Sequence, residues 1–547
     1  MVMWQPGKNY LKKILIVFCV IAVATKVNSQ VNETTSSSVY DYLYRMAQKG
    51  LIKWTDYQLP LDRKLISSAI DELFSKQDKL TKVESRELSF YRQEYLFDDS
   101  LNNEKIIFKK DAFNRFRAAK FEEGEAKIFV DPLIGLQFSK AGGKNIRHYF
   151  SGIRLAGYFG KRWGFNFSFR DNTEKGDSLP HTGSFSPVEG IVPTVQRPEL
   201  INYSSFNYNI GYRWSNGSLS AGQENLSWGY GIGGNIALSG RAPSFPFIKF
   251  DFQPWNWLHF NYFHGWLQSN IIDSARSYNT GTGIYNSTRE VYYPKFIAHH
   301  SLTVTPVKGL DISIGESMVY GDKIDFAYLI PINFFKVYDQ YNSTYNINAG
   351  DNAQFFGFIS SRNHLRKSHI YAQLFIDEIR VSKVFNNKEK RNQLGYTFGI
   401  NRTDLFLNYL TAGVEYSRLN PFVYNNLIPT QTYKTHSYSL GDWMGNNADR
   451  IYLFAQYVPL PKLRIKFWYQ KIRKGENGTL DQQYNQTPQP AFLFRKLFDF
   501  NESGFSARYE PINRLMITME MNKIHTQYTR DASFRQSGLR FGISYGL

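Results

Sequence analysis

The chain of 547 residues has one cysteine and only 20% charged residues, and it lacks an apolar run of bilayer-spanning length. A single cysteine excludes a disulfide framework and a multi-cysteine zinc site. The modest charge content, with a mean hydropathy of −0.42, excludes both a disordered chain and a helical membrane protein. If this chain spans a membrane, it must do so as a closed β-barrel.

The N-terminal residues have the features of a secretory signal peptide. Three lysines precede an apolar run at 14–24, and the small residue Ser29 follows. This run is too short for a transmembrane helix, which needs about 20 residues. We therefore predict a signal peptide at 1–29, cleaved after Ser29. Cys19 lies within the apolar run and is expected to belong to the signal, not to a lipidation site.

Helical periodicity follows at about 36–96. Ser38 is in position to cap a first helix that ends at Gly50, a second helix is expected at 61–74, and Thr81-Lys82-Val83-Glu84 forms a capping-box pattern for a third. We predict a periplasmic helical region at 30–115. The region also resembles a degenerate S-layer-homology repeat, so a cell-wall-binding module is the alternative to a plain three-helix packing unit.

From about residue 125 the apolar periodicity changes from helical to two. Trp163, Phe165, Phe167 and Phe169 alternate with polar residues, and the same pattern recurs to the C-terminus at 539–547. One apolar and one polar face is typical of a strand between lipid and a water-filled lumen. A soluble β-sandwich also alternates, so this pattern alone leaves both folds open.

A repeated turn favours the barrel. Four alternating segments end at a proline and are followed, after three residues, by a leucine that starts the next segment; the prolines are Pro254, Pro306, Pro459 and Pro511. Proline ends strand hydrogen bonding at a rim. Long polar loops separate these hairpins, at 171–200, 270–294, 333–354, 420–450 and 474–492. Short turns at one end and long loops at the other are typical of bacterial outer-membrane barrels. We predict an all-β transmembrane fold of about 16–18 strands at 116–547.

The sequence offers no catalytic constellation. It has no HExxH, no GxSxG and no phosphate-binding glycine loop. His299 and His300 are adjacent on a predicted strand and must face opposite sides, so they cannot share a metal. Four inward-phased residues are interpreted as part of a lattice of lumen charges: Arg464, Lys466, Glu520 and Asn522. We predict no catalytic residue, metal or cofactor.

Aromatic and amide residues concentrate in the long loops. Aromatic faces beside hydroxyl and amide groups suit sugar rings, and the formal net charge of +18 suits acidic glycans. The alternative is an ordinary aromatic girdle with polar loops. The residues that we predict to contact polysaccharide are Trp228, Tyr230, Arg241, Tyr338, Tyr341, Tyr433 and Trp443.

Three stretches resemble the Wzi-type capsule-assembly family, and two of them its Bacteroidetes members. The first contains Gly222-Gln223, Trp228-Gly229-x-Gly231, Leu238-Ser239, Ala242-Pro243 and Phe245-Pro246. The others are Gly315-Glu316-Ser317 with Tyr320-Gly321 and Tyr328-x-x-Pro331, and Tyr371-x-Gln373-Leu374-x-Ile376-Asp377-Glu378. Tyr230 stands where the family pattern usually has proline. Independently of the resemblance, the glycine-rich segment 228–234 is expected to be a strand bend or an insertion into the lumen.

The resemblance implies an outer-membrane barrel with a small helical bundle, which associates capsular polysaccharide with the cell surface without catalysis. The alternatives are a pore for small solutes and a component of an export or motility assembly. The expected partners are outer-membrane lipid, acidic or neutral surface polysaccharide, and the barrel-insertion machinery through the C-terminal strand, but no nucleic acid.

Overall fold

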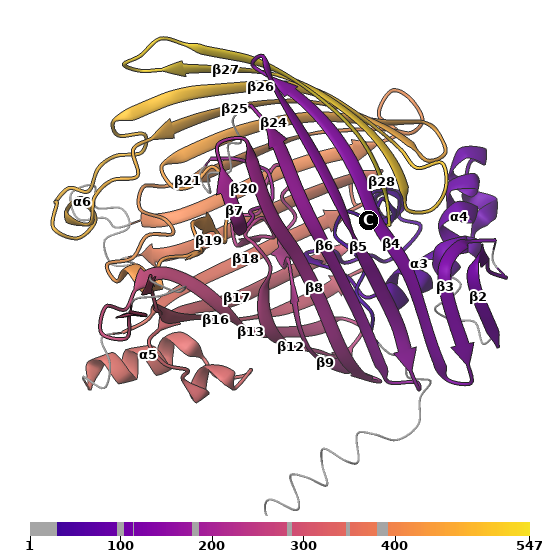
Figure 1. The fold of residues 1–547 in the computed structure, drawn as a ribbon, viewed down its shortest axis with the longest axis horizontal. Helices are drawn as coiled ribbons and strands as arrows, with labels where there is room; N and C mark the ends of the chain where they lie inside the picture. Colours follow the sequence, from indigo (N-terminus) through magenta and orange to yellow (C-terminus); the bar gives the residue numbers. More distant parts are fainter. Residues whose placement is uncertain are drawn as a thin grey trace, which may run out of the picture.

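The computed structural model describes residues 30–95, 103–112, 114–177, 185–281, 287–345, 350–379 and 392–546, and the predicted signal peptide lies outside them. These residues form a closed antiparallel barrel with helices at both ends (Figure 1). Eighteen strands make the closed wall, which confirms the predicted barrel at the upper end of the expected range.

The wall strands follow one another in chain order. They are β4 (Ala126–Ala141), β5 (Lys144–Phe159), β6 (Trp163–Gly176), β8 (Leu200–Trp214), β9 (Gly217–Glu224), β12 (Phe245–Trp255), β13 (Leu258–Ile272), β16 (Tyr292–Val307), β17 (Leu310–Gly321), β18 (Asn352–Arg362), β19 (Ser368–Ile379), β20 (Asn392–Thr403), β21 (Leu410–Leu419), β24 (Ala448–Leu460), β25 (Leu463–Gly475), β26 (Lys496–Tyr509), β27 (Leu515–Tyr528) and β28 (Phe534–Tyr545).

The barrel closes between its first and last wall strands. β28 pairs with the second half of β4, from Gly538 opposite Ala141 to Tyr545 opposite Ile134. The first half of β4 pairs instead with β3 (Phe116–Glu123), which forms a hairpin with β2 (Glu104–Lys110). β2 therefore extends the wall sheet, although it lies within the segment 30–115 that the sequence assigned to the helical region.

The alternation of side chains sets the two faces of the wall. On β17, Ile312 and Ile314 point outward and are 39% and 65% exposed, whereas Ser313 points inward and is buried. A barrel in lipid needs an outward apolar band, and Ile312 and Ile314 belong to such a band. In the described part of the chain, no helix has the length and apolar character that a membrane span requires.

The predicted proline hairpins are confirmed. In three of them the pairing register shifts at the proline, between Phe252 and Trp255, Val304 and Val307, and Tyr457 and Leu460. Proline cannot donate to the sheet, so it is accommodated at a bulge beside the turn. The fourth hairpin has its proline just after the end of β26. The short turns thus lie at one end of the barrel.

The helical region lies at the short-turn end, at the right of Figure 1. It contains α2 (Val39–Gln48), α3 (Arg63–Phe74), the short η1 (Gln77–Lys79) and α4 (Lys82–Tyr95). The predicted capping box is present, because the amide of Thr81 donates to Glu84 and the amide of Glu84 donates to the Thr81 hydroxyl. Ser38 precedes α2 but does not cap it; its hydroxyl donates to Glu510 instead.

The long loops contain small elements of their own. They are β7 (Pro193–Arg197), β10 (Ser227–Trp228), β11 (Leu238–Ser239), β14 (Tyr278–Asn279), β15 (Thr288–Arg289), η3 (Phe326–Leu329), α5 (Phe335–Thr344), η5 (Pro429–Gln431), β22 (Lys434–Thr435), β23 (Tyr438–Ser439) and α6 (Leu480–Tyr484). Of these, β10 pairs with β11 and also with β1 (Gln58–Leu59) from the helical region. A segment before α3 and a loop from the opposite end therefore meet inside the barrel.

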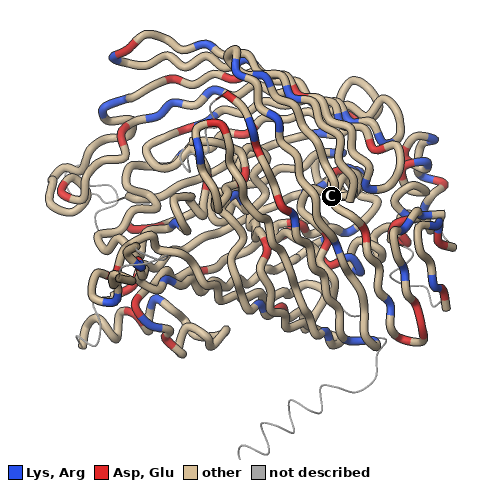
Figure 2. The backbone as a smooth tube through the Cα atoms, in the orientation of Figure 1, with Lys and Arg blue, Asp and Glu red and all other residues tan. Residues whose placement is uncertain are grey.

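Buried ion pairs hold the helical region together and fasten it to the barrel. The Glu33 carboxylate accepts from Arg63 at 2.7 Å and from Arg514 at 2.8 Å, and Glu94 accepts from Arg115 at 2.8 Å. All five side chains are at most 4% exposed. Charges of both signs gather at this end of the molecule (Figure 2). Removing one member of such a group leaves buried charge uncompensated.

We predict that Arg514→Ala weakens the attachment of the helical region by about 3 kcal/mol, because Glu33 and Glu94 lose a buried partner. Limited proteolysis should digest residues 30–95 faster while the barrel stays resistant. Arg530→Ala, in the exposed loop after β27, is the matched control and should behave like the wild type. Equal protection in both variants would contradict this role of Arg514.

We also predict that acid loosens this attachment. Burial raises the pKa of Glu94, but the guanidinium groups of Arg117, Arg115, Arg514 and Arg63 outweigh burial and hold the pKa well below 4.5. A carboxylate with a depressed pKa stabilises the fold above its unfolded pKa, and this contribution is lost as the pH falls. Protection of residues 30–95 should therefore decline below about pH 4.5. Glu94→Gln should flatten that decline, and an unchanged acid profile would contradict the assignment.

Candidate functional site: a cavity in the barrel lumen

Inward-folded loops fill the lumen with a hydrophobic core, which we call the lumen core. It combines side chains of the inner wall with side chains of the loops at 225–244 and 420–447 and with Tyr57 of the helical region. Trp228 is 1% exposed and packs edge-on against Phe263 and His299. The glycine-rich segment is thus an insertion into the lumen, one of the two arrangements that its sequence predicted.

Backbone hydrogen bonds fix the glycine-rich segment against the wall. The amides of Ile232 and Gly233 donate to the two oxygens of Glu415, at 2.7 and 3.1 Å. Gly229 has a φ of +137°, and a Cβ there would collide with Gln373 and Asn235. Glycine is required at this position because both the backbone conformation and the close approach exclude a side chain.

A cavity of about 360 Å³ lies beside this segment. Three of the predicted sugar-contacting residues line it together, namely Tyr230, Arg241 and Trp443. Its polar lining includes Asn235 and, from the helical region, Asp56. Ligand pockets commonly have volumes of about 300 to 1,000 Å³ and a few convergent polar groups, and this cavity fits that description.

The three predicted residues are held in different ways. The Trp443 indole N–H donates to the carbonyl of Gly233 at 3.1 Å, and the Arg241 Nε donates to the carbonyl of Val188 at 3.1 Å. The Tyr230 hydroxyl is buried and has no hydrogen-bond partner among the described residues. Burial raises the pKa of Tyr230 well above its usual range, so the hydroxyl keeps its proton and remains a donor.

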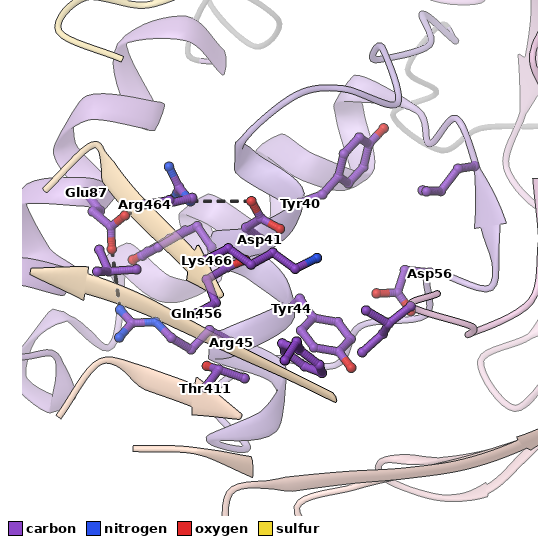
Figure 3. Close-up of a pocket in the computed structure, with 15 residues that line it drawn as sticks. Tyr40, Asp41, Tyr44, Arg45, Asp56, Glu87, Thr411, Gln456, Arg464 and Lys466 are labelled. Atoms are coloured by element: carbon purple, nitrogen blue, oxygen red, sulfur yellow. Dashed lines mark hydrogen bonds and ion pairs between the residues drawn. The ribbon is translucent and has the colours of Figure 1, made fainter. Parts of the chain in front are cut away.

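A second cavity, of about 210 Å³, lies between the helical region and the barrel wall (Figure 3). Tyr44, Asp56, Leu59 and Ile232 line both cavities, so the two are neighbours. At the far side of the second cavity, the Arg464 guanidinium donates to Glu87 at 3.2 Å. This contact pairs Arg464 with a carboxylate of the helical region, which agrees with the interpretation of Arg464 as part of a lattice of charges.

The structure separates the other predicted residues from the cavity. Trp228 and Tyr433 are 1% and 0% exposed and belong to the lumen core. Tyr338 and Tyr341 lie on α5, outside the barrel wall. Sequence reasoning missed Tyr44 and Asp56, which lie far from the aromatic loops in sequence. It also missed Asn235, which has no aromatic side chain. The pairing of β1 with β10 brings the helical region to the cavity. No local sequence pattern predicts this pairing.

The histidine pair confirms the prediction that its members face opposite sides. His299 is buried in the lumen core, whereas His300 lies outside the wall, where its Nδ1 is 3.0 Å from the carbonyl oxygen of Pro331. Within the described ranges, no group of three or more histidine, cysteine or acidic side chains is arranged to hold a metal.

Comparison with known proteins decides the family. The family model described as "Capsule assembly protein Wzi" matches residues 153–523. The chain belongs to this family. Among solved structures, the chain is similar to Wzi of Escherichia coli, described as an outer-membrane, carbohydrate-binding β-barrel involved in group 1 capsule assembly. The TM-score is 0.57 at 12% identity, over 96% of this chain and 100% of that one.

More distant similarity extends to other barrels. OccK3 (OpdO) and OccK8 (OprE) of Pseudomonas aeruginosa each align with 77% of this chain at 11% identity and a TM-score of 0.42, covering 95% and 98% of their own chains. A search of curated proteins gave no match. The chain is thus an outer-membrane β-barrel with the fold of the Wzi family.

We predict that the filled lumen carries no steady ion current in planar bilayers. Glu224 and Phe245 are strand partners, so a tight turn can replace 226–243 without breaking the wall. This replacement removes part of the lumen core and should raise the current above that of the wild type. Shortening the exposed β14–β15 hairpin is the control and should not. Steady porin-like currents from the wild type would contradict a filled lumen.

Proposed function

We propose that this protein binds capsular polysaccharide at the cell surface and organises it there without catalysis. The observation that carries the proposal is the lumen cavity, in which Tyr230, Trp443 and Arg241 surround a space of pocket size in a member of the capsule-assembly family. Aromatic faces suit the C–H faces of sugar rings, and the guanidinium suits hydroxyl or carboxylate groups.

The lumen core argues against a diffusion pore. Wide barrels conduct when their lumen is filled with water, but here the lumen core includes Trp228, Phe263 and Tyr433, which are buried. A solute would have to displace packed aromatic side chains. The assembly interpretation has less support, because the polar groups by which the helical region would dock elsewhere are used in contacts with the barrel, as in the pair of Arg464 and Glu87.

The topology of the chain follows from this proposal. The signal peptide at 1–29 exports the chain, the helical region lies in the periplasm, and the long loops face the exterior. The barrel-insertion machinery recognises β28, whose outward residues Leu539, Phe541 and Ile543 are exposed for lipid. The polysaccharide, acidic or neutral, approaches from the long-loop end, where Arg241 contributes positive charge.

Tyr230→Phe tests the cavity with little risk to the fold, because it removes only a buried hydroxyl that has no described partner. We expect unchanged or slightly higher thermal stability, since an unpartnered buried hydroxyl costs free energy. We expect the entering sugar to reach this hydroxyl and pair with it, so binding of purified capsular oligosaccharide should weaken about threefold to tenfold, the value of one hydrogen bond. Isothermal titration calorimetry of the folded barrel measures the binding, and differential scanning calorimetry measures the thermal stability.

Tyr278→Phe, on the exposed β14–β15 hairpin, is the matched control and should bind like the wild type. In cells, deletion of the gene should shift polysaccharide from the attached to the released fraction. The wild-type gene should restore attachment fully, and the Tyr230→Phe gene only in part. Unchanged oligosaccharide binding by Tyr230→Phe together with restored attachment would remove the cavity from the proposal. An unchanged distribution after gene deletion would overturn the function itself.

A further inference from the structure

A segment of the loop between β17 and β18 folds back over the outside of the barrel. We call residues 322–345 the outer hook; they include η3 and α5. Figure 1 shows α5 outside the wall beside β16 and β17, at the end opposite α3 and α4. The hook packs on the outward faces of Tyr262, Phe296 and Tyr320 through Tyr328 and Phe335, both of which are 0% exposed.

Beneath the hook, the outer wall is polar where a barrel is normally apolar. Glu316 points outward, on the same face of β17 as Ile312 and Ile314, yet it is 1% exposed. The His300 Nε2 is 3.3 Å from the Glu316 Oε1. The backbone N–H groups of Phe335 and Lys336, at the N-terminus of α5, donate to the Glu316 carboxylate. This acidic cap satisfies orphan amides and complements the helix dipole.

The position of Glu316 along β17 places the hook at the depth of the membrane. A strand crosses a bilayer in about 9 to 11 residues, and β17 runs from Leu310 to Gly321. Glu316 lies in the middle of that span, two residues beyond Ile314, which is 65% exposed. A carboxylate facing lipid there would cost several kcal/mol, so the hook must cover it within the bilayer.

The opposite side of the hook is apolar and open. Seven large apolar side chains of the hook are between 52% and 84% exposed, namely Phe326, Ile330, Ile332, Phe334, Val337, Tyr341 and Tyr345. A loop in water seldom presents so many in so few residues, and a patch of exposed apolar side chains marks an interaction surface. Phe334 lies against Phe355 on the outer face of β18, with ring centroids 6.2 Å apart, so the patch meets the outer surface of the wall and the same solvent is expected to cover both.

We propose that the outer hook is embedded in the outer leaflet of the membrane, with its exposed apolar side chains against lipid acyl chains. It is then an amphipathic element lying in the membrane beside the barrel. At its base, the Tyr338 hydroxyl donates to Asp325 at 2.9 Å and the Tyr328 hydroxyl donates to Asp351 at 2.8 Å, so the hook is ordered before it meets lipid. Tyr341, predicted from the sequence to contact sugar, is reassigned to lipid.

Spin labels test this placement in the full-length barrel. The only cysteine, Cys19, lies in the predicted signal peptide and is lost on cleavage, so single cysteines are introduced by Ile332→Cys, Phe334→Cys or Val337→Cys. Ile314→Cys supplies the lipid reference and Tyr278→Cys the aqueous reference. The labelled proteins are reconstituted in phosphatidylcholine vesicles, and folding is checked by heat-modifiable gel mobility. Relaxation by oxygen, which partitions into lipid, is compared with relaxation by a water-soluble nickel chelate.

We expect all three hook labels to match position 314, with strong oxygen relaxation and weak nickel relaxation. Nickel relaxation equal to that at position 278 would overturn the proposal. Labels that are shielded from both reagents in native outer membranes, but not in vesicles, would also overturn it, because a protein partner would then cover the patch. The experiment is independent of sugar binding, so its failure would leave the lumen cavity unaffected.

Discussion

The width of an eighteen-stranded barrel is the constraint on which the rest of this structure depends. Wall side chains alone cannot fill a lumen of that size, so it must contain either water or more of the chain. Here the chain enters from both ends: the segment with β1 comes from the helical region, and the loop with β10 and β11 comes from the opposite side. Their pairing makes one small sheet inside the wall, and the lumen core packs around it.

Different kinds of side chain fill the two ends of the lumen. At the helical end, buried ion pairs such as Arg63 with Glu33 hold charged groups together. Toward the long loops, aromatic packing dominates, and the cavity at Tyr230 and Trp443 is a defect in that packing. A defect lined by aromatic and polar side chains offers contacts that a ligand would complete, and for this reason we propose it as the binding site.

Local patterns in the sequence predicted the wall well, because lipid and lumen impose opposite polarities on alternate residues. The proline hairpins were also predictable from local sequence, because proline cannot donate a hydrogen bond to the sheet. The loops were less predictable, since aromatic residues have the same spacing whether they fold inward, as Tyr433 does, or lie outside, as Tyr341 does. Which loop residues share a cavity depends on how distant segments come together, as Asp56 and Tyr230 do in the lining of this cavity.

The outer hook shows how an exception to the alternation can itself be informative. His264, His300 and Glu316 are polar residues in the apolar phase of their strands, and each is covered or hydrogen-bonded on the outer side. Lipid cannot form hydrogen bonds with such groups, so a segment of the chain must supply their partners. Polar residues in the lipid-facing phase therefore indicate that a loop returns to the wall. The apolar side chains on the far side of that loop restore the surface that the bilayer requires.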